Sequence, residues 1–324
     1  MRSGTLRVAA KWVLLAVLAA ALVAAPLVLD RYTVFLLYLI FLYIGLAQGW
    51  NLLAGYAGLI SLGIAAFFGI GAYTAAMTII HLKFHFLLGS LVGGLFAMIF
   101  AALIAVPIFR FRGIYFTIGT LVIAEALRIF MISWKFTGSA DGLNLPTESN
   151  PSLTWFYYLM LGAAALATVL ILLILRTKLG IGLRAIGNNE RSAQNMGVNT
   201  FRTKLYIFLL SAFITGIVGG IYATQMGSIE PYSIFSAMWT LSTANIVIIG
   251  GIGTVLGPIL GSVFMVVLSE LLADYHTFHL VITGALLIVI IRFIPAGIWG
   301  ELRGTRWARL ALGKTKRMGT YNAS

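Results

Sequence analysis

Glu125 and Arg128 stand out because they lie three residues apart inside a run of apolar residues. A spacing of i, i+3 places both side chains on one face of a helix, where they can form an ion pair. Ionised groups in such surroundings are costly, so each needs a partner or a function. Two interpretations stay open at this stage: an ion pair that fastens helices together, or the polar lining of a pathway.

Few residues remain for catalysis. The chain has no cysteine, four histidines and nine acidic residues, which excludes a thiolate nucleophile and a cysteine metal site. It contains no G-x-x-x-x-G-K-[ST] phosphate loop and no H-E-x-x-H motif, so we do not expect it to hydrolyse ATP by that route. His276 and His279 are spaced three residues apart without supporting carboxylates, and we expect no metal site. The sequence therefore does not predict an enzyme.

The composition is that of a membrane protein. Hydrophobic residues make up 60% of the 324 residues, charged residues make up 10%, and the mean hydropathy is +1.00. Soluble domains carry about 25% charged residues, so a soluble enzyme, a DNA-binding domain and a disordered tail are all disfavoured. We predict an all-α polytopic membrane protein.

Predominantly apolar windows of about 20 residues, most of them without formal charge, mark the expected spans. They fall at 12–29, 33–54, 57–80, 86–109, 113–133, 155–175, 204–226, 239–253, 255–273 and 278–294. The segment 239–253 is short for a full crossing, so we predict eight to ten transmembrane helices. Residues 12–29 also resemble a signal peptide, but we favour an uncleaved helix because many spans follow.

The distribution of basic residues predicts the orientation. Eighteen of the 22 Lys and Arg residues fall on one side when the spans alternate from a cytoplasmic N-terminus. Cytoplasmic loops carry such an excess, so both termini are expected in the cytoplasm. This divides the chain into a cytoplasmic N-terminus (1–11), a transmembrane domain (12–294) and a basic cytoplasmic tail (295–324). The net charge of +13 is thus a topology signal, not a nucleic-acid footprint.

Two connections are long, an outer loop at 134–154 and an inner loop at 176–203. The inner loop contains two segments, 183–186 and 192–196, that we expect to form short amphipathic helices. Gly187 and Gly197 would close them as C-terminal caps. Composition leaves open whether this loop lies on lipid headgroups or docks a cytosolic partner.

Glycine is abundant, with 35 residues. The stretch 250–258 combines clustered glycine with Pro258, and broken backbone at membrane depth is tolerated only where it is shielded or lines a cavity. A substrate path and a tight turn explain it equally well. Other glycines fit close packing between helices, where small residues let backbones approach: Gly63, Gly69, Gly71, Gly216, Gly219 and Gly220.

Taken together, several segments resemble the LivM-like permeases, which are membrane subunits of ABC importers for branched-chain amino acids and related solutes. The resemblance runs in order from about residue 33 to 295. It is carried by Gly49–Gly63, Ala65–Tyr73, Arg112–Phe116, Thr120–Leu121, Glu125–Arg128, Thr137–Leu143, Arg184–Glu190, Ala193, Met196–Val198 and Gly250–Gly261.

The resemblance implies a subunit of the bacterial inner membrane that moves solute by alternating access. It implies that this chain binds no cofactor and that ATP is bound by two separate cytoplasmic ATPase subunits. It further implies an extracytoplasmic solute-binding protein and a second permease subunit, which together with this chain forms a heterodimer.

The resemblance also assigns roles to individual residues. The coupling segment that docks the ATPase would include Arg184, Gly187, Glu190, Arg191 and Gly197. The translocation pathway would include Ser61, Thr120, Glu125 and Arg128.

The sequence departs from the family near Ser61, because Leu59 and Ile64 stand where relatives often carry Gln and His. This loss of two polar groups raises the question of a different or less polar solute. Two alternatives to an importer remain at this stage. One is an ion-coupled secondary transporter that uses Glu125 as its proton or Na⁺ site, and the other is a structural membrane subunit.

Overall fold

A computed structural model of the chain describes residues 20–146, 152–272 and 297–304. It also describes residues 17, 282, 284, 285, 288 and 292–294. Seven helices in this described part are long and apolar enough to cross a membrane. They are α2 with its π-helical continuation η1 (Arg31–Asn51 and Leu52–Tyr56), α3 (Ile64–Leu82), α4 (Phe86–Ile108), α5 (Ile114–Ser133), α6 (Leu153–Arg176), α9 (Thr200–Met226) and the pair α10 (Pro231–Ile234) and α11 (Ala237–Gly250).

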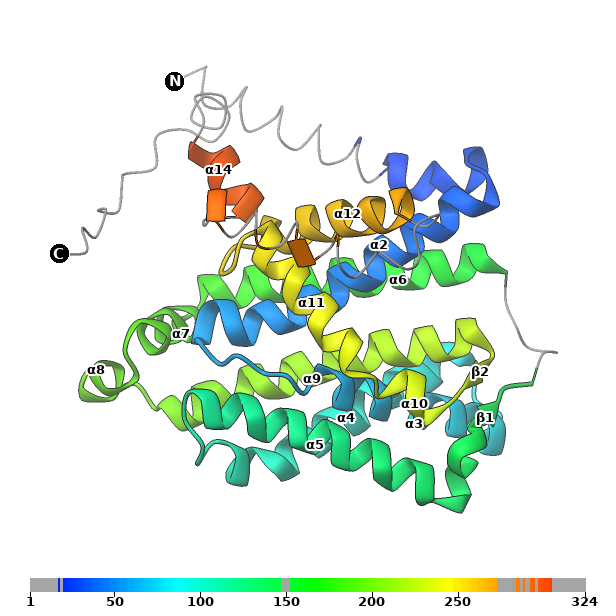
Figure 1. Cartoon of the computed structure of the whole chain (residues 1–324), viewed down its shortest axis with the longest axis horizontal. Helices are drawn as coiled ribbons and strands as arrows, with labels where there is room; N and C mark the ends of the chain where they lie inside the picture. Colours follow the sequence, from blue (N-terminus) through cyan, green and yellow to red (C-terminus); the bar gives the residue numbers. More distant parts are fainter. Residues whose placement is uncertain are drawn as a thin grey trace.

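The remaining elements lie at the two ends of this bundle (Figure 1). At one end are α7 (Lys178–Asn188) and α8 (Glu190–Asn195), and at the other are β1 (Leu143–Asn144) and β2 (Ser228–Ile229). The two strands form an antiparallel pair, beside the 3-10 turns at Lys135–Thr137 and Ser139–Asp141. We refer to these as the α7–α8 end and the β1–β2 end. Two further helices are α12 (Leu256–Leu271) and α14 (Gly297–Gly304).

The all-α prediction is confirmed, and most predicted spans match observed helices. One boundary is wrong: the span predicted at 57–80 begins only at Ile64, because residues 58–63 are not helical. In the predicted 12–29 span, residues 20–28 are helical and most of 12–19 lies outside the described residues, as does most of the predicted 278–294 span. The helix α12 has 16 residues, about 24 Å at 1.5 Å per residue, which is shorter than a bilayer core of about 30 Å.

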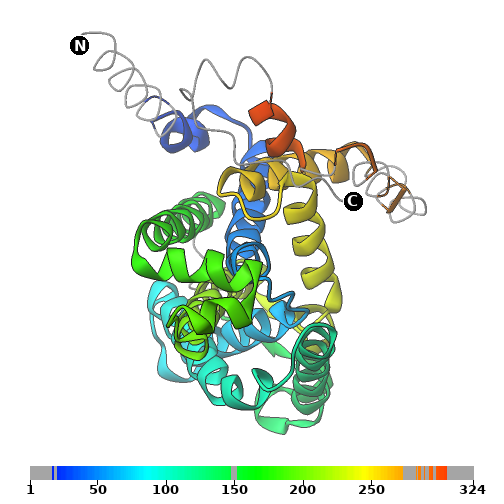
Figure 2. The ribbon, with the colours of Figure 1, turned by 90° about the vertical axis from the view of Figure 1, so that its left-hand side faces the viewer.

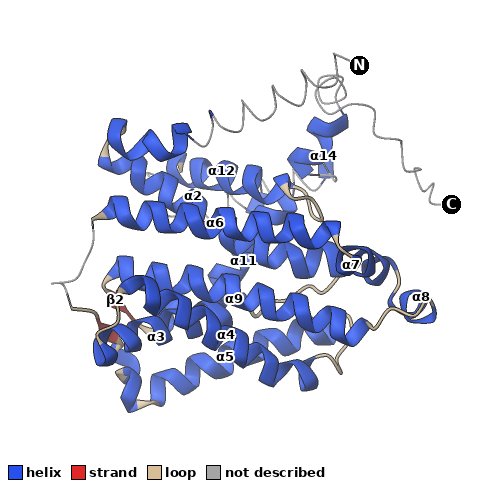
Figure 3. Cartoon of the chain, turned by 180° about the vertical axis from the view of Figure 1, so that it is seen from behind, coloured by secondary structure: helices blue, strands red, loops and turns tan. Residues whose placement is uncertain are grey.

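Helices differ greatly in how much protein surrounds them. The α3 window is 78% buried, whereas that of α5 is 17% buried. Viewed along the helices from the α7–α8 end, α5 and α6 lie at the rim on opposite sides of α2 (Figure 2). Seen from behind, α9 runs between α6 and the pair α4 and α5 (Figure 3). The centre of the bundle therefore consists of α2, α3 and α9.

Glycine residues allow the backbones of α3, α4 and α9 to approach one another closely. A Cβ added at Gly71 of α3 would lie 2.1 Å from the carbonyl oxygen of Gly216 in α9. One added at Gly93 of α4 would lie 2.4 Å from the carbonyl oxygen of Gly71. Three helix backbones thus meet where no side chain intervenes, as is common in membrane proteins. The predicted packing role of Gly71 and Gly216 is confirmed.

We expect Gly71→Ala to lower the stability of the chain by about 1–3 kcal/mol, because the added methyl group overpacks a backbone contact. The measurement is the thermal unfolding midpoint in detergent. Gly162→Ala in α6 is the matched control, because nothing lies within 4 Å of its added Cβ. At position 162, the better helix propensity of alanine predicts that the stability of the chain rises by up to about 1 kcal/mol. Equal midpoints for the two variants would show that the backbone contact is not tight.

Candidate functional site

Residues 58–63 form a break in the helical backbone between η1 and α3, visible in Figure 1 as the uncoiled blue segment. The indole Nε1–H of Trp50 donates a hydrogen bond of 2.7 Å to the carbonyl oxygen of Ser61. The Ser61 hydroxyl in turn accepts one of 3.2 Å from the Gly63 N–H. Ser61 itself is fully buried. Its side chain and backbone thus stabilise the break from within.

The helix α5 supplies the other partners of this break. The Thr117 hydroxyl donates to the carbonyl oxygen of Ile60 (2.8 Å). The Thr120 hydroxyl accepts from the Leu62 N–H (2.9 Å) and donates to the Thr117 carbonyl oxygen (2.9 Å). Non-helical backbone inside a membrane requires such partners.

Two of the predicted pathway residues, Ser61 and Thr120, therefore lie together, since they bond to the adjacent residues Gly63 and Leu62. Thr120 is 3% exposed, and its single hydroxyl hydrogen is already donated to Thr117. The structure gives both hydroxyls the task of holding backbone. A direct contact of either with solute stays a prediction.

A second break connects α11 to α12 through a glycine-rich loop, in which Gly251 and Gly253 have φ values of +123° and +72°. The Asn51 side chain of α2 clamps this loop: its Nδ2 donates to the Thr254 carbonyl oxygen (2.8 Å), and its Oδ1 accepts from the Gly253 N–H (2.9 Å). Gln48 donates to the carbonyl oxygen of Val255 (2.9 Å).

Sequence reasoning missed the roles of Gln48 and Asn51. Both side chains are fully buried, and a buried amide needs hydrogen-bond partners. Two amides one turn apart in an apolar span were a usable signal. Their partners come from residues some 200 positions away, however, and only the fold reveals them.

The helix α7 touches the first break directly. A Cβ added at Gly187 would lie 2.6 Å from the carbonyl oxygen of Tyr56, the last residue of η1. We predicted Gly187 as a C-terminal cap, and that prediction is wrong. The helix continues to Asn188, and Gly187 lies within it, where its missing side chain permits the close approach to η1.

The helix α8 ends at Asn195, and Gly197, with φ +83°, closes this end as predicted. The Gly197 N–H donates a hydrogen bond to the Gln194 carbonyl oxygen (2.9 Å), and the Val198 N–H donates one to the Ala193 carbonyl oxygen (3.1 Å). These bonds satisfy carbonyl groups that the helix end leaves open.

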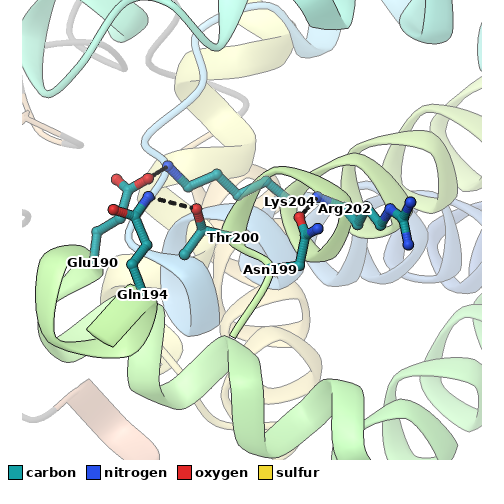
Figure 4. A network of polar contacts seen from close by, with 6 residues as sticks. All are labelled: Glu190, Gln194, Asn199, Thr200, Arg202 and Lys204. Carbon is teal, nitrogen blue, oxygen red and sulfur yellow. Dashed lines mark hydrogen bonds and ion pairs between the residues drawn. The ribbon is translucent and has the colours of Figure 1, made fainter. Parts of the chain in front are cut away.

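Side chains also tie α8 to the start of α9 (Figure 4). The Lys204 ammonium lies 2.5 Å from a carboxylate oxygen of Glu190, and the Lys204 side chain is 9% exposed. The Gln194 amide donates to the hydroxyl of Thr200 (2.9 Å). Glu190, which we predicted as an ATPase contact, thus has an internal partner that fixes the orientation of α8.

Unlike Glu190, the side chains of Arg184 and Arg191 have no ion pair with any residue that the structure describes, and both residues are exposed. These two cations remain available to a partner at the α7–α8 end.

Glu125 and Arg128 form the ion pair that their spacing predicts, with Arg128 Nε donating to Glu125 Oε1 (3.1 Å). Both belong to α5, so the pair does not by itself join two helices. The Arg128 guanidinium also lies 5.5 Å from the ring centre of Tyr232 in α10. The side chains are 30% (Arg128) and 48% (Glu125) exposed. Glu125 lies five residues beyond Thr120, about 7.5 Å along the helix, so this pair is separate from the hydrogen bonds that Ser61 and Thr120 make at the break.

Within the described part of the chain, no group of three or more His, Asp or Glu side chains is arranged to hold a metal ion. His276 and His279 lie outside the described residues.

Residues 32–291 match the protein family described as branched-chain amino acid transport system / permease component. The high-affinity branched-chain amino acid transport system permease protein LivM of Escherichia coli (strain K12) is 28% identical over 306 residues, which cover 85% of this chain and 72% of the relative. No solved structure matches the chain.

Two further relatives match shorter stretches. The permease protein LivH of the same type of system in Salmonella typhimurium is 27% identical over 175 residues, covering 53% of this chain and 54% of LivH. The autoinducer 2 import system permease protein LsrC of Yersinia pseudotuberculosis is 26% identical over 238 residues, covering 69% of this chain and 65% of LsrC.

We expect Glu190→Gln to lower the free energy of local unfolding of α8 by about 1–3 kcal/mol, because it leaves the nearly buried Lys204 ammonium without its charged acceptor. Hydrogen exchange of the α8 amides measures this directly. Arg191→Gln is the matched control, since Arg191 is exposed and unpaired among the described residues. A positioning role for Glu190 would be contradicted if the exchange rate of the α8 amides is unchanged in Glu190→Gln, or if it rises equally in both variants.

Proposed function

The chain belongs to the family of permease components of branched-chain amino acid transport systems, and from this premise we propose how it works. It is a multi-pass permease subunit of an ABC importer in the inner membrane. We propose that its solutes are branched-chain amino acids or related small solutes, which pass by alternating access. ATP hydrolysis takes place on two cytoplasmic partner subunits, and this chain itself binds no cofactor.

The contact between Gly187 and Tyr56 carries this proposal. It joins α7, at the end of the bundle, to η1, the point where α2 is interrupted. On its other side, η1 contacts the glycine-rich loop, because a Cβ at Gly55 would lie 2.6 Å from the Gly253 nitrogen. A movement of α7 therefore reaches both breaks without crossing a flexible connection.

In this proposal the α7–α8 end faces the cytoplasm and docks the ATPase. The exposed cations Arg184 and Arg191 contact it, Gly187 passes its movement to η1, and Glu190 and Gly197 hold α8 in place. The excess of basic residues predicted for this side supports the assignment.

The pathway runs along the exposed face of α5 and α10. An ion pair that is one third to one half exposed is too costly to face hydrocarbon, so water or protein must cover Glu125 and Arg128. A second permease subunit of related fold supplies that cover, and solute passes between the two subunits. LivM and LivH are both named as permeases of one type of system, which supports a heterodimer. A solute-binding protein delivers solute at the β1–β2 end.

The family favours this function over an ion-coupled transporter. The geometry of Glu125 agrees, because a carboxylate already paired with Arg128 is a poor site for a proton or Na⁺. We propose that, of the two departures near Ser61, Leu59 is the one that affects solute choice. It is only half-buried, whereas Ile64 is fully buried and serves packing.

The energy source tests the proposed function. Cells that produce the complete importer should stop taking up labelled leucine when ATP is depleted, even with a proton gradient in place. They should continue when an uncoupler removes the gradient but ATP is maintained. Continued uptake in ATP-depleted cells would overturn the assignment.

The ion pair of α5 provides a second test. We expect Glu125→Gln to lower uptake about tenfold or more, because an unpaired Arg128 at membrane depth costs roughly 2.5–3.5 kcal/mol. Uptake and copurification of the second permease are both measured. Ser133→Ala, at the end of the same helix, is the control and should leave both unchanged. If Glu125→Gln retains full uptake and assembly, the pair has no part in the pathway.

A further inference from the structure

A groove of about 760 Å³ opens between α3, α4 and α5 toward the β1–β2 end. It lies on the opposite side of α5 from the Glu125 carboxylate, since Leu127, Phe130 and Trp134 line it while Glu125 does not. Apolar side chains from all three helices form its walls, among them Ile70, Met77, Phe96, Leu103, Leu127 and Trp134. The lining side chains that carry a hydroxyl or an imidazole are Tyr73, Thr74, Thr78 and His81.

The dimensions of the groove restrict what fills it. Its lining along α3 extends from Ile70 to Leu82, which is about 18 Å at 1.5 Å per residue. That length is close to half of a hydrocarbon core of about 30 Å, the depth of one leaflet. The groove therefore matches the length of an acyl chain from one leaflet, and it is shorter than a helix that spans the whole core.

The chemistry of the lining excludes two other occupants. A zwitterionic amino acid needs partners for both charges, and none of the lining side chains is an acid, a lysine or an arginine. Stable water clusters need several polar partners for each molecule, which four polar side chains spread along an otherwise apolar groove do not provide. An apolar chain of one leaflet's length fits both the size and the chemistry.

The open end of the groove carries features of a lipid headgroup region. Trp134, Phe136 and His81 lie there, with the His81 ring stacked on Phe136 at 5.2 Å. Aromatic rings are enriched at this level of a membrane. The lining residues Phe84 and Phe136 are each preceded in the chain by an exposed lysine, Lys83 and Lys135. Neither lysine has an ion pair among the described residues.

We infer that this groove binds one acyl chain of an anionic phospholipid from the leaflet at the β1–β2 end, and that Lys83 and Lys135 attract its phosphate. The lipid thereby fills the space between α4 and α5, behind the face of α5 that carries Glu125 and Arg128. This inference does not depend on which solute the chain transports.

Quenching of tryptophan fluorescence tests the site. The full chain is placed in phosphatidylcholine nanodiscs with increasing fractions of phosphatidylglycerol brominated on one acyl chain. Comparison with Trp134→Phe isolates the signal of Trp134. We expect this signal to be quenched and to saturate at a low fraction of brominated phosphatidylglycerol. Leu103→Phe, which narrows the groove, should abolish the saturable quenching, whereas the control Leu95→Phe, on α4 but outside the groove, should not.

The headgroup is tested separately. Lys83→Gln and Lys135→Gln should each raise the fraction of lipid needed for half-saturation about fivefold. Quenching that rises linearly and equally with brominated phosphatidylcholine would show only bulk lipid contact and overturn the site. Absence of Trp134 quenching would show that protein covers the groove, and would overturn it as well.

Discussion

A peptide group inside a membrane must find a hydrogen-bond partner, and the two helix breaks of this chain depend on that constraint. The break at residues 58–63 is held by the Trp50 indole and by two threonine hydroxyls of α5. The loop after α11 is held by the amides of Gln48 and Asn51. Because Gln48, Trp50 and Asn51 lie within four residues of α2, one short stretch of one helix stabilises both breaks.

This arrangement explains why distant parts of the chain form one functional unit. The helix α7 contacts η1 through Gly187, and η1 adjoins the glycine-rich loop through Gly55. The residues of α5 that support the first break precede Glu125 by one to two turns. We propose that a displacement at the α7–α8 end is passed through these backbone contacts to the helix that we assign to the pathway.

Apolar periodicity and charge placement predicted the helical architecture well, because burial in a membrane imposes strong and local constraints on sequence. Gly197 was predicted correctly for the same reason, since a left-handed cap is a local property. Gly187 was not, because its missing side chain serves a contact with Tyr56, about 130 residues earlier. The partners of Asn51, Glu190 and Thr120 likewise depend on tertiary packing. Their residue types marked them as unusual, but the sequence did not contain their geometry.

Our central proposal is that movement of the ATPase passes from α7 to η1 and the two breaks beside it, and that the Asn51 clamp keeps the glycine-rich loop coupled to this movement. The most direct test is the amount of solute transported per ATP hydrolysed by the reconstituted importer carrying Asn51→Leu. Our account predicts continued ATP hydrolysis, because the docking surface at α7 and α8 is intact, together with a marked fall in transport per ATP. An unchanged ratio in a correctly assembled variant would contradict it.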